Sequence, residues 1–133
     1  RRILNIAEYR SVFEMFKPLL ISSALVCAAG MASAEFAKVN NLDQFKEIVT
    51  GKTLTRPLVR IEVTADGSIE GSGVRWAVTG NWSWRDGYFC RSLFWGGDDL
   101  GYNCQEVRIN DSRIQFTSDR GAGDSAIFRL RNN

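Results

Sequence analysis

The 133-residue chain contains no histidine, and it has only three cysteines and two prolines. Without an imidazole it cannot build a Ser-His-Asp triad, a Cys-His nucleophile pair or a His/Cys zinc site. Carboxylates can still work in pairs, but the one adjacent pair, Asp98-Asp99, is explained by a solvated turn. We therefore expect no catalytic residues and no metal site.

The sequence also lacks the glycine-rich turn of dinucleotide-binding proteins, a G-x-G-x-x-G run between a strand and a helix. Two shorter runs, Gly71-Ser72-Gly73 and Gly121-Ala122-Gly123, are each followed by a predicted strand. Neither leads into a helix N-terminus whose N–H groups would hold a pyrophosphate. We expect no nicotinamide cofactor and no other cofactor.

Residues 15–34 have the pattern of a secretory signal peptide. Lys17 supplies the positive charge, residues 19–29 form a short apolar run, and Ala32-Ser33-Ala34 matches an A-x-A cleavage site. We expect residues 1–14 to be an upstream extension that is not native to the protein. Residues 35–133 are then a single exported domain, periplasmic or secreted, that leaves the membrane after cleavage.

The charge of that domain is balanced. Residues 35–133 carry 13 Lys and Arg and 13 Asp and Glu. This balance predicts no basic field that would attract nucleic acid or an acidic membrane surface. The expected partners are accordingly a small apolar ligand or an envelope protein.

One helix followed by short strands accounts for the domain. Asn41 is a suitable N-cap for a helix over residues 42–50, whose apolar side chains recur on one face. A turn about Ala122 predicts Phe116 opposite Phe128. Alternating apolar residues and turn signals predict seven strands, at residues 58–64, 68–71, 74–85, 88–95, 101–109, 113–118 and 125–131.

This order predicts a mainly β fold, with one N-terminal helix followed by about seven antiparallel strands in a meander. A sheet of this length with one apolar face tends to curl and close. We therefore expect a small closed or strongly bent barrel, with the helix at an open end or over a face. A two-sheet sandwich is the alternative.

Two cysteines, Cys90 and Cys104, remain after signal-peptide cleavage and predict one disulfide in an exported chain. A hairpin centred on Gly97 pairs position 90 with 104, and it also pairs Phe94 with Leu100. Closing such a loop contributes roughly 3 kcal/mol in the chain-entropy model.

The hairpin at Asp86-Gly87 decides where Arg91 points. A two-residue turn pairs Trp82 with Arg91 and turns the arginine inward, whereas a three-residue turn pairs Trp82 with Cys90 and turns it outward. The sequence leaves both registers open.

Aromatic residues gather in the strands around the predicted disulfide and are the strongest candidates for a binding site. If they line a cavity in a barrel, they would bind a small ligand, with Arg91 or Arg75 as a polar anchor. If they only fill the core of a small domain, they carry no site. The candidate ligand-binding residues are Trp76, Trp82, Trp84, Tyr88, Arg91 and Trp95.

The run GNWSWRDGYFCR at residues 80–91, with Cys104 downstream and DRGAGD at residues 119–124, resembles a group of small secreted proteins of Gram-negative bacteria. The resemblance covers essentially all of residues 35–133 and implies no site residues. Some members carry the label dihydrodipicolinate reductase. The reductase has a dinucleotide-binding unit and a His- and Lys-based active site, both missing here, so we interpret the label as a mis-transfer.

Two functions stay open on the sequence alone. The first is an exported binding module for a small apolar or amphipathic ligand, which a cavity of at least about 300 Å³ would favour. The second is a periplasmic protein-binding inhibitor or envelope factor, which a filled interior with exposed aromatics at one rim would favour. An enzyme with the reductase label is a third.

The signal-peptide interpretation predicts cleavage after Ala34. N-terminal sequencing of the exported protein should begin at Glu35, because the A-x-A motif ends there. Exported protein that retains residues 15–34, or that carries a lipid on Cys27, would contradict this prediction.

Overall fold

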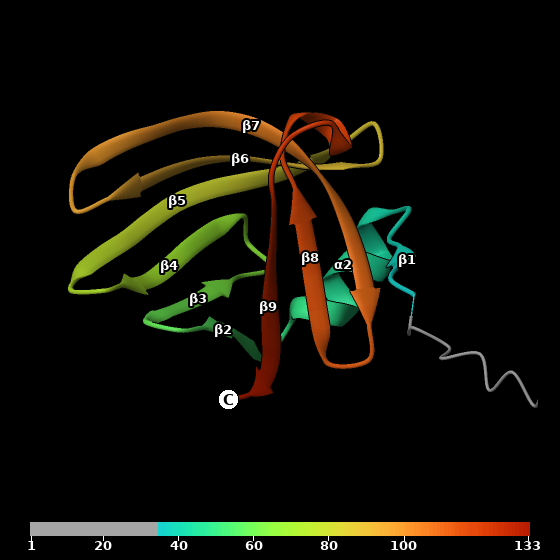
Figure 1. The fold of residues 1–133 in the computed structure, drawn as a ribbon, viewed down its shortest axis with the longest axis horizontal. Helices are drawn as coiled ribbons and strands as arrows, with labels where there is room; N and C mark the ends of the chain where they lie inside the picture. The colour runs from blue at the N-terminus through green and yellow to red at the C-terminus, as the bar shows by residue number, and fades with distance from the viewer. Residues whose placement is uncertain (1–34) are drawn as a thin grey trace, which may run out of the picture. The chain divides into compact units, whose positions relative to one another are not determined.

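The computed structural model describes residues 35–133, which form nine strands, one α-helix and one short 3-10 helix. From β2 to β9 each strand pairs antiparallel with the next along the chain, and β9 pairs with β2. These eight strands form a closed barrel (Figure 1). The strand β1 (Ala37–Lys38) pairs with β7 outside the ring. The predicted meander barrel is confirmed, and the sandwich is not formed.

The barrel has eight strands where the sequence predicted seven. The missing one is β2, because its sequence Lys-Thr-Leu-Thr-Arg contains one apolar residue and shows no alternation. The barrel strands are β2 (Lys52–Arg56), β3 (Val59–Val63), β4 (Ser68–Gly73), β5 (Trp76–Arg85), β6 (Tyr88–Trp95), β7 (Asp98–Asn110), β8 (Arg113–Thr117) and β9 (Ser125–Asn132).

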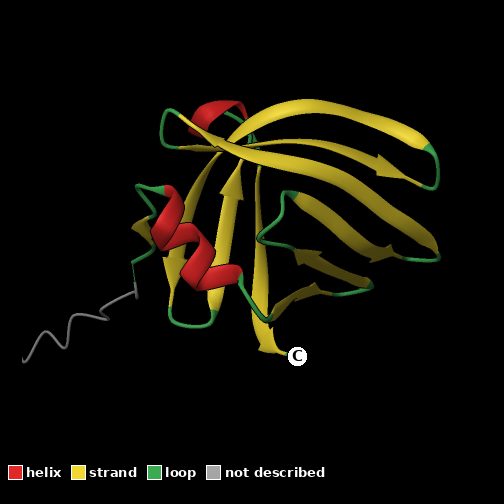
Figure 2. Cartoon of the chain, turned by 180° about the vertical axis from the view of Figure 1, so that it is seen from behind, coloured by secondary structure: helices red, strands yellow, loops and turns green. Residues whose placement is uncertain are grey.

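The helix α2 (Leu42–Val49) lies at one end of the barrel (Figure 2). It begins as predicted, because the side chain of Asn41 accepts a hydrogen bond from the backbone N–H of Gln44 at 2.9 Å. Its apolar face buries Phe45 completely. The Phe45 ring centroid lies 5.2 Å from those of three barrel aromatics, Trp82, Trp84 and Phe89. The helix therefore closes this end with aromatic packing.

Alternate side chains of each strand face the barrel interior, as period two requires. One row across the wall runs Val63, Ile69, Gly80, Leu93 on four successive strands. A Cβ at Gly80 would lie 2.2 Å from the backbone oxygen of Ser92, so no other residue fits there. Gly80 thus allows β5 and β6 to bend closely together and leaves the row without a side chain at its centre.

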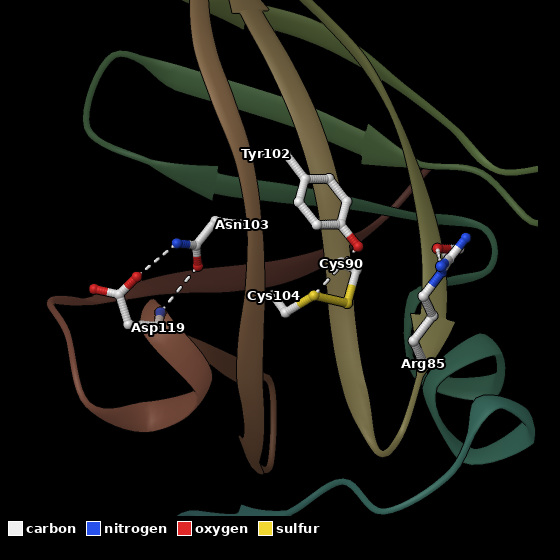
Figure 3. Close-up of a disulfide and its surroundings, with 7 residues drawn as sticks. Arg85, Cys90, Tyr102, Asn103, Cys104 and Asp119 are labelled. Atoms are coloured by element: carbon white, nitrogen blue, oxygen red, sulfur yellow. Dashed lines mark hydrogen bonds between the residues drawn. A yellow bond between two sulfur atoms is a disulfide. The ribbon is translucent and has the colours of Figure 1, made fainter.

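The predicted disulfide is confirmed. Cys90 and Cys104 are directly opposite on β6 and β7, with their Cα atoms 3.9 Å apart (Figure 3). The predicted pairing of Phe94 with Leu100 is wrong, because Phe94 pairs with Asp99. The turn has two residues, Gly96 and Gly97, and an irregularity in the β6–β7 pairing between Ser92 and Phe94 then shifts the register.

Three other expectations about strands and their pairing are corrected. The strand predicted over residues 74–85 begins at Trp76, because Val74 adopts a left-handed φ of 56° in the turn before it. The strand predicted over residues 68–71 extends to Gly73. In the last hairpin Phe116 pairs with Ala126 and not with Phe128, a register two residues from the predicted one.

The predicted signal peptide and the extension before it lie outside the described residues. Within residues 35–133, no helix has the length and apolar character needed to cross a bilayer.

The packing of α2 predicts a large stability loss for Phe45→Ala. Removing a fully buried phenylalanine should lower the free energy of unfolding by about 3–5 kcal/mol, measured by urea denaturation. Leu42→Ala on the same helix is the control and should cost about 0.5 kcal/mol or less, since Leu42 is 36% exposed. Equal losses for the two variants would contradict the assigned role of Phe45.

Candidate ligand-binding site

A cavity of about 180 Å³, partly open to solvent, lies inside the barrel next to the helix-closed end. Its wall is almost entirely apolar, with two polar side chains, Arg91 and Gln105. The other lining residues come from six strands and are Leu54, Ile61, Val63, Ile69, Phe89, Leu93, Phe116, Ala126 and Phe128.

The lining residues differ in exposure, which shows where the cavity meets solvent. Val63, Ile69 and Phe89 are buried. Ile61 and Ala126 are half-buried, as are Arg91, Leu93 and Gln105. The cavity therefore has a dry apolar floor and a partly open side that carries its polar groups.

Arg91 points into the barrel because the Asp86-Gly87 turn has two residues. Both turn residues have positive φ, 52° and 84°, as a type I′ hairpin requires. Trp82 then pairs with Arg91. Of the two registers left open by the sequence, the structure has the one that turns this arginine inward.

Among residues 35–133, no carboxylate forms an ion pair with Arg91. Its Nη1 donates a hydrogen bond to the backbone oxygen of Gly101 at 3.0 Å. Within residues 35–133 the one ion pair is between Arg108 and Glu106, elsewhere on β7. Burial lowers the pKa of the Arg91 guanidinium from its ordinary value, although the group stays protonated at neutral pH. The cavity wall thus carries a positive charge without a counter-charge.

The disulfide holds the two polar lining residues in place. Arg91 and Gln105 each follow one of the bonded cysteines, so the bridge on the other side of the wall fixes their strands side by side. The Tyr102 hydroxyl donates to Cys104 Sγ at 3.4 Å (Figure 3). The Gln105 side chain donates to Ser118 Oγ at 3.3 Å, which steadies it from the loop before β9.

The structure brings one of the six candidate residues into the cavity wall, namely Arg91. Trp82 and Trp84 pack on Phe45 at the helix-closed end, where Trp82 Nε1 donates to the Thr64 backbone oxygen at 2.9 Å. At that end Trp82 belongs to the hydrophobic core and Trp84 packs against it.

The other three candidates lie elsewhere. Trp76 and Trp95 contact each other edge to face, with centroids 5.5 Å apart, near the β6–β7 turn. Tyr88 pairs with exposed Arg85 and so faces outward, with Lys38 Nζ and the Arg120 guanidinium each within 6 Å of its ring. Arg75, the second anchor considered, is exposed in the β4–β5 turn.

Most residues of the cavity wall are not among the candidates predicted from the sequence. Phe116, Phe128 and Gln105 come from strands β7 to β9, which meet β2 and β3 only when the barrel closes. The period-two pattern of these strands predicts which side chains face the barrel interior. It does not predict which of those side chains leave an empty space between them and so line a cavity.

Because the Arg91 guanidinium forms no ion pair within residues 35–133, we expect the fold to tolerate Arg91→Met. Methionine keeps an apolar stem, removes the buried charge and loses one hydrogen bond, so the free energy of unfolding should fall by no more than about 1 kcal/mol. Urea denaturation measures this. A decrease of about 3 kcal/mol or more in the free energy of unfolding would show that Arg91 is needed for the stability of the fold, and it would contradict a role in ligand binding alone.

Within residues 35–133 no group of three His, Cys, Asp or Glu side chains is placed to hold a metal ion. Comparison with known proteins adds no assignment, because no protein family model, curated protein or solved structure matches the chain. The site is therefore described by its geometry alone. It is a small apolar cavity whose wall contains one guanidinium without an ion pair among residues 35–133.

Proposed function

We propose that this protein is an exported binding module that takes a small amphipathic anion into its barrel cavity. The observation that carries the proposal is Arg91, a half-buried cation in an apolar wall, with no carboxylate partner in the part of the chain that the structure describes. A buried charge without a partner costs stability, and an anionic ligand would offset that cost. The disulfide is compatible with an oxidising compartment outside the cytosol.

The cavity volume limits the ligand. At about 180 Å³ the cavity is smaller than the roughly 300 Å³ expected for a drug-sized molecule. An apolar cavity of about 150 Å³ is nevertheless enough to bind benzene. The size therefore favours a single-ring or short-chain carboxylate, whose apolar part lies against Phe116 and Phe128 and whose carboxylate meets Arg91.

A second candidate function, a protein-binding inhibitor or envelope factor, is supported by a different observation. Strands β5 to β7 carry a group of large apolar side chains that are substantially exposed, and exposed apolar groups of this kind mark interaction sites. They are Trp76 at 52%, Phe94 at 39%, Leu100 at 52% and Tyr102 at 60%.

The reductase label gains no support from the site. The N-terminus of α2 follows Val39-Asn40-Asn41, which has no glycine, and the Asn41 side chain already accepts from the Gln44 N–H. A dinucleotide needs such N–H groups free for its pyrophosphate.

Titration of the full chain with benzoate and hexanoate, followed by calorimetry and tryptophan fluorescence, tests the proposal. Arg91→Met should weaken binding at least about tenfold, because it removes a charged hydrogen-bond donor from the carboxylate. Arg75→Met, which changes an exposed arginine outside the cavity, should leave the affinity within about twofold. NADPH serves as the probe for the reductase alternative.

No binding of either acid at millimolar concentration, or equal weakening by the two variants, would contradict the proposed site. Native mass spectrometry of protein purified from its export compartment separates the alternatives. A retained small anion supports the binding module, whereas a stoichiometric protein partner lost on Tyr102→Ala supports the protein-binding function.

A further inference from the structure

A second set of arginines lies on the outer wall of the barrel, where β9 closes the ring onto β2. Arg113, Arg129 and Arg131 alternate with the inward residues Ile114, Phe128 and Leu130, so they face outward. Together with Arg56 they line a groove of about 520 Å³. No lysine or acidic residue contributes to this lining.

The register places like charges directly opposite one another. Arg129 on β9 pairs with Arg113 on β8 and, on its other side, with Thr55 on β2. Arg131 is two residues further along β9 and shares the same face. Opposed residues in a sheet have Cβ atoms about 5 Å apart, and like charges at that spacing destabilise the pairing.

Nothing within residues 35–133 neutralises these side chains, since none of them forms an ion pair. Arg56 and Arg113 instead lie over aromatic rings, each with its guanidinium carbon 5.6 Å from a centroid, of Phe128 and Phe36 respectively. Arg131 Nε donates to Thr55 Oγ1 at 3.3 Å. Stacking on a ring face holds a guanidinium in place and leaves the N–H donors at its edge free.

The groove also coincides with a split in the wall. The pairing of β2 with β9 ends at Thr55 and Arg129, and β9 then continues toward Ser125 paired with β8 alone. Pro57 and Ile127 lie at this split and give the groove an apolar part beside its charged part. The site thus fits a ligand with a compact anionic group and an apolar portion.

We propose that this groove binds a phosphate monoester group, carried by a free phosphorylated molecule or by a lipid headgroup. Arginine forks match phosphate oxygens in pairs, and a phosphate dianion offers three acceptor oxygens. Several converging arginines present more donors than a single carboxylate can accept. Arg113, Arg129 and Arg131 are on the opposite side of the wall from Arg91, although the groove shares Phe128 with the cavity. The proposal does not depend on the function proposed for the cavity.

Titration of the full chain with phenyl phosphate at constant ionic strength tests the proposal. The double variant Arg113→Gln/Arg129→Gln should weaken binding at least about tenfold, because it removes two of the converging charged donors. The control Arg75→Gln/Arg85→Gln removes the same charge from exposed arginines outside the groove, and it should change the affinity by less than about twofold. Equal weakening by the two double variants, or no binding at all, would overturn the proposal.

Thermal unfolding without ligand gives an independent readout. The groove variant should unfold at a temperature no lower than the unaltered chain, since it relieves the repulsion between Arg113 and Arg129. A clearly lower temperature would mean that these arginines maintain the fold, and it would overturn a binding role.

Vesicle flotation distinguishes the sources of the phosphate. Binding to phosphatidylcholine vesicles that contain phosphatidic acid, lost in the groove variant, would support a lipid headgroup. Binding of phenyl phosphate without vesicle binding would support a free phosphorylated molecule. Binding of a hexaglutamate peptide in preference to phenyl phosphate would overturn the proposal and assign the groove to an acidic protein segment.

Discussion

The contact between Phe45 and the aromatic residues of β5 and β6 determines how the rest of the molecule is organised. A closed meander leaves two ends open, and apolar side chains at an open end are in water. Phe45 fills one end against Trp82, Trp84 and Phe89. The dependence is mutual, because an isolated helix of eight residues is unstable in water and forms only when its apolar face is packed. The remaining space in the barrel is thereby confined to the part beyond these rings.

Turn length then decides what that space contains. Side chains alternate between the two faces of a strand, so one additional residue in the Asp86-Gly87 turn would pair Trp82 with Cys90 and turn Arg91 to solvent. The two-residue turn instead brings a cation inside. The shift in the β6–β7 register brings Cys104 opposite Cys90, and the bond between them holds Arg91 and Gln105 on adjacent strands, in diagonal positions on the inner face. The chemistry of the cavity thus follows from local backbone geometry at a hairpin and an irregular strand pairing.

Local patterns in the sequence predict the local parts of this fold. The Asn41 cap, the period-two strand before Asp86 and the cysteine pair are each recognisable within a single short segment of at most about fifteen residues, and each is confirmed. The strand β2 escapes prediction because Leu54 is its one apolar residue, and it is stabilised by neighbours distant in the sequence, β3 and β9. The tryptophans were natural candidates for a site. Their volume, however, makes Trp82 and Trp84 fill the closed end, and smaller residues are left to line the cavity.

The balanced number of acidic and basic residues does not show how the charges are distributed over the barrel. Residues 35–133 have as many acidic as basic side chains, and this balance predicts no basic field. In the folded barrel, however, Arg113 faces Arg129 across β8 and β9, and Glu62 faces Glu70 across β3 and β4. A sequence shaped by stability alone would interleave these signs, since opposite charges at such positions are favourable and like charges are not. Departures of this kind from local consistency are expected where a protein binds something. Within residues 35–133, arginines without ion-pair partners lie on both faces of the barrel wall, and both proposals of an anionic ligand rest on this observation.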